Sequence, residues 1–161
     1  MELVGKIKSK VERVKFSTDI IVGFPGETEV DFADTLQVMQ QVKFAKVHMF
    51  PYSDRPRTRS CLMPNKVSQD VMKERKQTVL RLSEQLSFEL RETYIGRRME
   101  VLTESVDPGH PGEIAGHTMN FLPVLVQGNG FESNQLIEVE LIANTARGLV
   151  GRPLSQSEHQ G

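Results

Sequence analysis

The sequence is poor in cysteine and in long apolar runs. Cys61 is the only cysteine among the 161 residues, which excludes an internal disulfide and a cysteine-ligated metal cluster built by this chain alone. No stretch approaches the roughly 20 apolar residues that a membrane-spanning helix needs. The stretch from Met1 to Lys10 also lacks the apolar core of a signal peptide. We therefore expect a cytoplasmic protein without a membrane partner, and we assign no metal ligand.

The chain has little net charge, but its charges are unevenly distributed. Residues 1–91 contain 16 Lys and Arg against 12 Asp and Glu, whereas residues 92–161 contain 4 against 9. The overall net charge of −1 therefore conceals a basic first part and an acidic second part. Such a shift in composition predicts a domain boundary near residue 92.

The first part alternates between helical and strand patterns. The spacing of apolar residues predicts a helix, a strand, a second helix and a second strand, over residues 2–11, 14–22, 29–42 and 45–52. Short links join these segments, which is typical of parallel βαβ units with a right-handed crossover. The fold class predicted for this part is therefore α/β.

A glycine-containing turn follows the first predicted strand. Gly23 and Gly26 free the backbone there, and Pro25 stiffens the turn. Thr28 and Asp31 have the spacing of a capping box that opens the next helix. Because ligands of α/β sheets and barrels bind at the carboxyl ends of strands, the turn is a candidate cofactor site. A tight connection without a ligand is the alternative.

The second part changes to short strand-like runs. A polar loop over residues 53–66 and a long helix over 68–93 come first. Five short strands are then predicted over residues 98–103, 113–118, 121–126, 136–143 and 148–152. Turn-forming residues at 107–109, 128–130 and 144–146 separate them. Five short strands in about 60 residues predict a small closed barrel.

Three ordered motifs resemble a known family. They are STDIIVGFPGET at residues 17–28, VHMFPYS at 47–53 and GHTMNFLPV at 116–124. The chain resembles the carboxyl-terminal part of a radical S-adenosylmethionine (SAM) methylthiotransferase. The resemblance implies the end of a radical SAM β/α barrel over residues 1–91, an OB-like TRAM barrel over 92–155 and a disordered tail over 156–161. The second motif is most similar to the branch that acts on threonylcarbamoyl-adenosine next to the tRNA anticodon, and the isopentenyl-adenosine branch is close.

The resemblance also implies cofactors and partners. SAM and tRNA are expected to bind, and family members also carry [4Fe–4S] clusters held by cysteines that this sequence lacks. We therefore expect the chain to need a missing amino-terminal half for catalysis, and we assign it no catalytic residue. The residues implied at the SAM pocket are Asp19, Ile21, Gly23, Phe50 and Tyr52.

The RNA contacts predicted for the chain include a loop and the small barrel. An arginine cluster in the loop is a candidate for phosphate contacts, although a solvated loop explains it equally well. Arginines near both ends of the barrel region are expected to converge if its first and last strands are neighbours. His117 and Asn120 follow the family's turn, and Phe121 is either a stacking residue or a core residue. The predicted RNA-binding residues are Arg55, Arg57, Arg97, Arg98, His117, Asn120, Phe121, Arg147 and Arg152.

Other residues favour a structural interpretation. His48 is predicted to be a packed or hydrogen-bonded histidine rather than a general acid–base group. Glu27 is predicted to be a favourable charge at a helix start, with a ligand contact as the alternative. Arg75, with its neighbours on the long helix, is predicted to lie on a solvated face. Two alternative functions stay open at this point: a non-catalytic RNA-binding module, and another α/β enzyme with an apolar cofactor pocket.

Overall fold

The computed structural model describes residues 2–11, 14–106 and 110–154. The chain divides into two compact units, one up to Ser87 and one from Phe88 onward, and each is described separately. The sequence predicted a boundary near residue 92, a few positions away. The expected turn at 107–109 and tail at 156–161 lie outside the described residues. Within the described residues, no helix is both long and apolar enough to cross a membrane.

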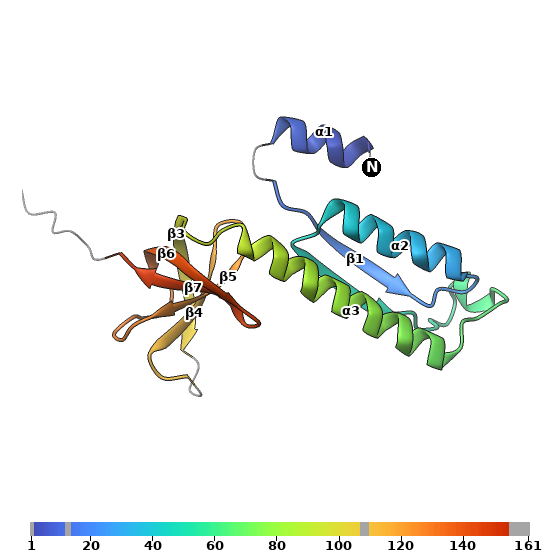
Figure 1. The fold of residues 1–161 in the computed structure, drawn as a ribbon. Coiled ribbons are helices and arrows are strands. Elements are labelled where there is room, and N and C mark those ends of the chain that lie inside the picture. Colours follow the sequence, from blue (N-terminus) through green and yellow to red (C-terminus); the bar gives the residue numbers. More distant parts are fainter. Residues whose placement is uncertain (1, 12–13, 107–109, 155–161) are drawn as a thin grey trace, which may run out of the picture. The chain divides into compact units, whose positions relative to one another are not determined.

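The first unit contains the predicted helix and strand order. Its elements are α1 (Glu2–Lys10), β1 (Ser17–Val22), α2 (Glu29–Val42), β2 (Lys46–Pro51), a 3-10 turn (Ser60–Leu62) and most of α3 (Gln69–Glu92). Strand β1 pairs with β2 in parallel, as the βαβ pattern predicted. Figure 1 shows α2 and α3 running alongside this sheet. In the described part of the chain the sheet has these two strands, so its assignment to a radical SAM barrel stays a prediction.

One face of the β1–β2 sheet is covered by helices. Val22 of β1 packs with Phe32 and Met39 of α2 and with Met72 and Val79 of α3 in one apolar cluster. The side chains of a strand alternate between the two faces of its sheet. Alternate residues of β1 and β2 are accordingly exposed on the opposite face, which we call the open face.

The turn between β1 and α2 ends in the predicted capping box. The Thr28 hydroxyl accepts a hydrogen bond from the Asp31 backbone N–H at 3.2 Å. The Asp31 carboxylate accepts one from the Thr28 N–H at 2.9 Å. These two bonds satisfy backbone donors that a helix start leaves unpaired, and they fix where α2 begins.

The second unit is a closed barrel. Its strands are β3 (Arg98–Val106), β4 (Glu113–Thr118), β5 (Pro123–Gln127), β6 (Leu136–Thr145) and β7 (Gly148–Pro153). Their order around the described barrel is β3-β4-β5-β7-β6, and β6 pairs back with β3. The pairs are antiparallel except for β5 with β7. The predicted five-stranded closed barrel is therefore confirmed.

Buried residues from every strand fill this barrel. Val101, Ile114, Val126, Val139 and Leu149 form part of its core. Glycine is required on β4 where it packs against the backbone of β3. A Cβ atom built at position 116 would lie 2.3 Å from the backbone oxygen of residue 102, so no larger residue fits there without a shift of the strands.

Candidate cofactor face and RNA interface

Three of the five predicted cofactor residues lie on the open face. In the register of the parallel pair, Ile21 is opposite Phe50 and Asp19 is opposite His48. The side chains of Ile21 and Phe50 are 54% and 50% exposed. An apolar pair and a polar pair therefore lie side by side. This composition suits a ligand with a flat apolar part and a charged part.

The structure corrects the interpretation of His48. This residue was predicted to be packed or hydrogen-bonded within the fold, but it is exposed on the open face. The pairing of β1 with β2 explains the difference, because it places position 48 on the face away from the helices, beside Asp19. His48 therefore belongs to the same surface as the predicted cofactor residues.

Gly23 lies in the turn just beyond β1. Its φ of 77° is in the left-handed region, which favours glycine. A Cβ atom built there would lie 2.7 Å from Cγ of Met72. The Gly23 backbone N–H donates a hydrogen bond to Oε2 of Glu27 at 2.6 Å. This donor is therefore used within the turn.

A buried arginine from α3 holds the same glutamate. Nη1 of Arg75 donates to Oε2 of Glu27 at 2.6 Å and to the Glu27 carbonyl at 3.1 Å, and Nη2 donates to Glu29. The Arg75 and Glu27 side chains are 5% and 10% exposed. Burial by itself lowers the pKa of Arg75, but the hydrogen bonds to Glu29 and Glu27 outweigh it and raise that pKa. We call Gly23, Glu27 and Arg75 the turn latch.

The turn latch corrects two predictions. Arg75 was expected on a solvated face, but only 4% of the residue is exposed. Glu27 was interpreted as a favourable charge for a helix start, but its carboxylate instead joins the Gly23 amide to α3. A signal for Arg75 was present in the sequence. It lies between Met72 and Val79 on the apolar stripe of the helix, a position where a charged residue needs a partner.

Tyr52 lies apart from Phe50. Strand β2 ends at Pro51, and the Tyr52 N–H donates to the Val22 carbonyl at 2.8 Å. Its ring packs against the helix-side cluster and makes an edge contact with Phe24 at 5.3 Å. Its hydroxyl donates to Oδ1 of Asp54 at 3.0 Å. The predicted cofactor residues therefore divide between the open face and the turn region.

The two expected cofactors fit this chain differently. The open face offers apolar side chains and a carboxylate, which suit the adenosyl and the charged parts of SAM. An iron–sulfur cluster needs several thiolates, and Cys61, which is partly buried, is the only cysteine of the sequence. Among the described residues no group of three His, Cys, Asp or Glu is placed to hold a metal ion. The residues of this chain therefore do not fit the cluster.

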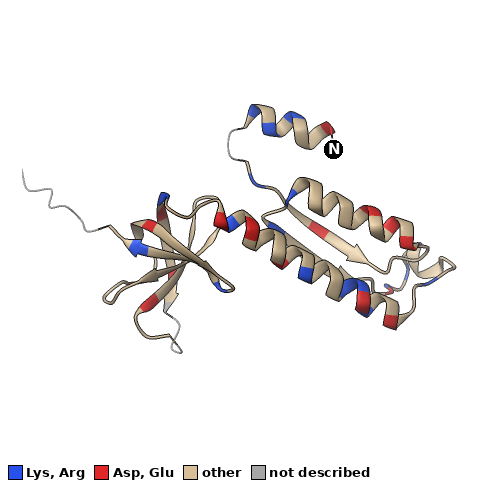
Figure 2. Ribbon diagram, in the orientation of Figure 1, with Lys and Arg blue, Asp and Glu red and all other residues tan. Residues whose placement is uncertain are grey.

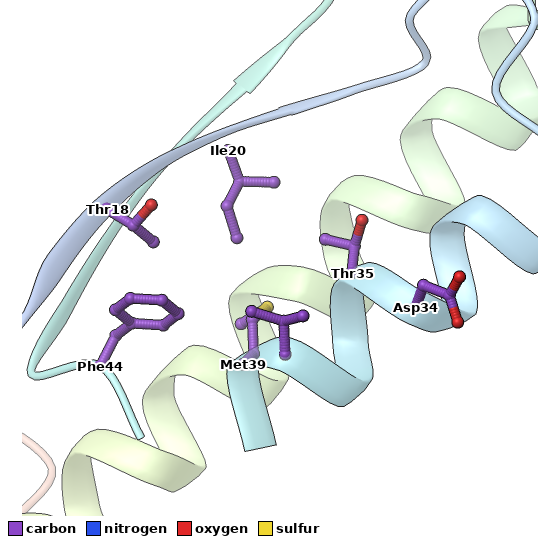
Figure 3. A pocket seen from close by; sticks show the side chains of 7 residues that line it. Thr18, Ile20, Asp34, Thr35, Met39 and Phe44 are labelled. Atoms are coloured by element: carbon purple, nitrogen blue, oxygen red, sulfur yellow. The ribbon is translucent and has the colours of Figure 1, made fainter. Parts of the chain in front are cut away.

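A pocket of about 280 Å³ lies on the other side of β1 (Figure 3). Its lining is mostly apolar, with Ile20 from β1, Met39 from α2 and Phe44 from the following turn. Thr18, Asp34 and Thr35 supply its polar atoms. The pocket belongs to the helix-covered side of the sheet and is separate from the open face.

The loop after β2 carries the predicted arginine cluster. Arg55 and Arg57 are exposed, and Arg57 has a φ of 70°. The end of this loop bonds to the glycine turn, because the Gly26 N–H donates to the Asn65 carbonyl at 2.9 Å. The loop and the turn therefore lie together at the carboxyl end of the sheet. Phosphate binding by Arg55 and Arg57 at this end stays a prediction.

In the barrel, two of the predicted RNA contacts lie at the end of β4 and in the turn that leads to β5. The rings of His117 and Phe121 are stacked, with centroids 5.2 Å apart and planes within 7°. Phe121 is 79% exposed, so it is not a core residue. Nδ1 of His117 lies 3.0 Å from a carboxylate oxygen of Glu104. Residues 117–122 are called the aromatic turn below.

Asn120 joins the aromatic turn to an arginine. Its amide Nδ2 donates to the hydroxyl of Tyr94 at 3.2 Å. The Tyr94 ring lies 4.9 Å from the guanidinium carbon of Arg97. Arg97 is exposed, whereas Tyr94 is only 4% exposed. Sequence reasoning overlooked Tyr94, a buried tyrosine whose hydroxyl has a hydrogen-bond partner, as is usual for this residue type.

The other predicted barrel arginines do not all converge. The first and last strands, β3 and β7, were expected to be neighbours, but β6 lies between them. Arg98 is opposite Glu140 on β6, and Arg152 forms an ion pair with the same glutamate at 2.7 Å. Arg147, in the turn just before β7, pairs with Glu113 at 2.9 Å. Figure 2 shows the resulting mixture of basic and acidic positions on the barrel.

Comparison with known proteins finds relatives that share one name. A scan against protein-family profiles finds no match. Proteins named tRNA-2-methylthio-N(6)-dimethylallyladenosine synthase are similar to this chain. The one from Fusobacterium nucleatum is 40% identical over 141 residues, which are 88% of this chain and 32% of that protein.

Two further relatives have the same name. The protein from Finegoldia magna is 35% identical over 151 residues, or 94% of this chain and 33% of its own length. The protein from Pelotomaculum thermopropionicum is 34% identical over 160 residues, or 99% of this chain and 36% of its own length. This chain therefore spans about a third of the length of these relatives, and it matches their carboxyl-terminal region.

Proposed function

Because the chain belongs to the radical SAM methylthiotransferase family, as the counterpart of its carboxyl-terminal part, we propose that it works within a tRNA methylthiotransferase. In this function a methylthio group replaces the hydrogen of a C–H bond in a tRNA adenosine. The similarity over nearly the whole chain to relatives with this name carries the proposal. SAM, iron–sulfur clusters and tRNA belong to the proposal as cofactors and substrate of the longer enzyme.

The two units of the chain have separate roles in this proposal. The open face supplies part of the wall around SAM, with Ile21 and Phe50 against the adenosyl group and Asp19 near the charged end. The barrel supplies RNA contacts, with Arg97 and the aromatic turn. The clusters are held by cysteines outside this sequence, so in this proposal the chain supplies no cluster ligand.

The nucleoside substrate has two candidates. The second sequence motif favoured threonylcarbamoyl-adenosine, whereas the names of the relatives refer to dimethylallyladenosine. We propose the dimethylallyl nucleoside first, because that name recurs among the relatives, and threonylcarbamoyl-adenosine second. Each yields a methylthiolated product of different mass, so one analysis of tRNA nucleosides distinguishes them.

A chimera tests the function. The amino-terminal part of the Fusobacterium relative is joined to this chain and expressed in a bacterium without methylthiotransferase genes. The tRNA is then digested, and its nucleosides are measured by mass spectrometry. Methylthiolated adenosine above the level of an empty vector is the expected result. If the relative's own full chain restores the product and the chimera does not, the proposed function is wrong.

A non-catalytic RNA-binding module is the second candidate function. The closed barrel and the single cysteine favour it, because the barrel is complete without further strands and the chain cannot hold a cluster alone. This candidate predicts that the chain binds tRNA while the chimera stays inactive. The leading proposal predicts an active chimera.

A further inference from the structure

Phe121 combines strain with exposure. Its φ of 59° places a bulky residue in the left-handed region, which aromatic residues rarely adopt. At the same time 79% of the residue is exposed to solvent. The ring gains little from burial at this position, and its backbone is not in a relaxed conformation. Strain at an exposed side chain is typical of a residue that contacts a ligand.

The aromatic turn holds this conformation with a dense set of hydrogen bonds. The Phe121 N–H donates to the Thr118 carbonyl at 2.8 Å, and the Thr118 N–H donates to the Leu122 carbonyl at 3.0 Å. The Thr118 hydroxyl accepts from the Leu122 N–H at 3.0 Å and donates to Oδ1 of Asn120 at 2.6 Å. Thr118 and Leu122 are buried, so the barrel fixes both ends of the turn. The barrel therefore fixes the backbone conformation that presents the ring.

A second aromatic ring supports the first. His117 stacks on Phe121 with nearly parallel planes, and the Glu104 carboxylate holds the His117 imidazole by its Nδ1 atom. On the same turn, Asn120 is hydrogen-bonded to Tyr94, and the Arg97 guanidinium lies over the Tyr94 ring. The turn that carries the exposed Phe121 ring is thus connected to the Arg97 guanidinium through Asn120 and Tyr94. Single-stranded nucleic acid offers the matching chemistry, a base for the ring and a phosphate for the cation.

We propose that Phe121 stacks on an unpaired base of RNA, that His117 positions the Phe121 ring, and that Arg97 contacts an adjoining phosphate. This inference rests on the proposed function only in taking RNA as the partner. It goes beyond that function by naming Phe121 as the residue that contacts a base and by specifying that the bound RNA is single-stranded. Double-stranded RNA keeps its bases stacked on one another and presents no free face to Phe121.

The test measures RNA binding by the complete chain. The probes are a fluorescein-labelled oligoadenylate of about twelve nucleotides, a length within the range that one small barrel covers, and the same sequence as a duplex. Fluorescence anisotropy gives the dissociation constants. Removing a stacked base contact weakens binding by about 5- to 150-fold. We expect this loss for Phe121→Gly, with tighter binding of the single strand than of the duplex in the parent.

Glycine is the informative replacement because it separates binding from folding. A glycine adopts the left-handed conformation without strain, so Phe121→Gly removes the ring and leaves the barrel at least as heat-stable as the parent. If Phe121 were structural, the thermal midpoint of this variant would fall instead. Phe121→Tyr keeps a stacking ring and is expected to bind within about twofold of the parent. Met119→Ala is the matched control, because Met119 is 83% exposed on the same turn.

Two further variants test the supporting residues. His117→Ala removes the ring behind Phe121 and is expected to weaken single-strand binding less than Phe121→Gly does. Arg97→Ala is expected to lower the slope of log affinity against log salt by about one phosphate contact. An unchanged salt slope in Arg97→Ala would show that Arg97 makes no phosphate contact.

The outcomes distinguish this inference from the proposed function. If Phe121→Gly binds the oligoadenylate as well as the parent does, or if the parent prefers the duplex, base stacking by Phe121 is wrong. If the parent binds neither probe, the inference is wrong as well, and a protein partner becomes the better occupant of the turn. The chimera measures the methylthio product directly, so an inactive chimera counts against the proposed function, whereas the binding results of these variants decide only the roles of Phe121, His117 and Arg97.

Discussion

The turn latch gives the sharpest test of the first unit. Arg75→Met removes a guanidinium that is 5% exposed and leaves the Glu27 carboxylate, 10% exposed, without its cation. Removing one partner of a buried ion pair costs about 3–5 kcal/mol of unfolding free energy. The lower end applies here, because the Gly23 N–H still donates to this carboxylate. We therefore expect Arg75→Met to lose about 3 kcal/mol.

The double variant Glu27→Gln with Arg75→Met tests the cause of that loss. It removes both charges and keeps an amide oxygen that accepts from Gly23. A neutral pair carries no buried charge, so we expect the double variant to be more stable than Arg75→Met alone. The interaction energy of this double-mutant cycle is expected to be about 1–3 kcal/mol. Additive single effects would show that the ion pair contributes nothing specific.

These free energies are measured by urea unfolding, followed by circular dichroism in the helical band. The helical signal reports on the first unit, because the three described α-helices lie wholly or mostly in it. Arg81→Met is the matched control, since Arg81 is exposed on the same helix. Its expected change is within about 0.5 kcal/mol. Hydrogen exchange of the Gly23 amide adds a local measurement, and we expect faster exchange in Arg75→Met. Equal stability of Arg75→Met and Arg81→Met would refute the turn latch.

Three further substitutions test the turns and the barrel. Gly23→Ala is expected to destabilise the first unit by about 1–3 kcal/mol, because its backbone is left-handed and the new methyl meets Met72, as urea unfolding will show. Asp31→Asn is expected to lower the thermal midpoint at neutral pH. Hydrogen bonds from the Thr28 backbone and, to a smaller extent, from its hydroxyl lower the pKa of Asp31. The ionised carboxylate therefore stabilises the parent above the ordinary aspartate pKa. The difference in thermal midpoint between parent and variant is expected to close as the pH falls through the lowered pKa. Gly116→Ala is expected to cost about 3 kcal/mol in the thermal unfolding of the barrel, because the added methyl overlaps a neighbouring backbone oxygen.

The element order was predictable because each element had a local signal. The capping box of Thr28 and Asp31 marked the start of α2, and the β-branched run before Gly23 marked β1. The number of barrel strands also followed from local signals, since turn residues separate the strand patterns. The order of strands around the barrel did not, because β5 pairs with β7 through contacts between distant segments.

The parts of the candidate site that sequence reasoning missed depend on tertiary contacts. The expectation of solvent exposure for Arg75 failed because Glu27 of the glycine turn and Glu29 of α2 form ion pairs with it. Tyr52 is two residues from Phe50, and uninterrupted alternation would place both on the open face. Strand β2 ends at Pro51, which lets the Tyr52 ring pack on the helix side instead.

The exposure of the open face is consistent with the proposal that this chain is part of a longer enzyme. Parallel sheets are normally covered on both faces, whereas Ile21 and Phe50 are half exposed here and no described strand extends the pair. An apolar face of this kind favours association until further strands or a ligand cover it. In the proposed enzyme, SAM is the ligand that covers this face and the amino-terminal region supplies the further strands. The same proposal leaves the barrel unchanged, because its described strands already form a closed barrel. RNA binding by the aromatic turn should therefore not depend on the amino-terminal region of the proposed enzyme.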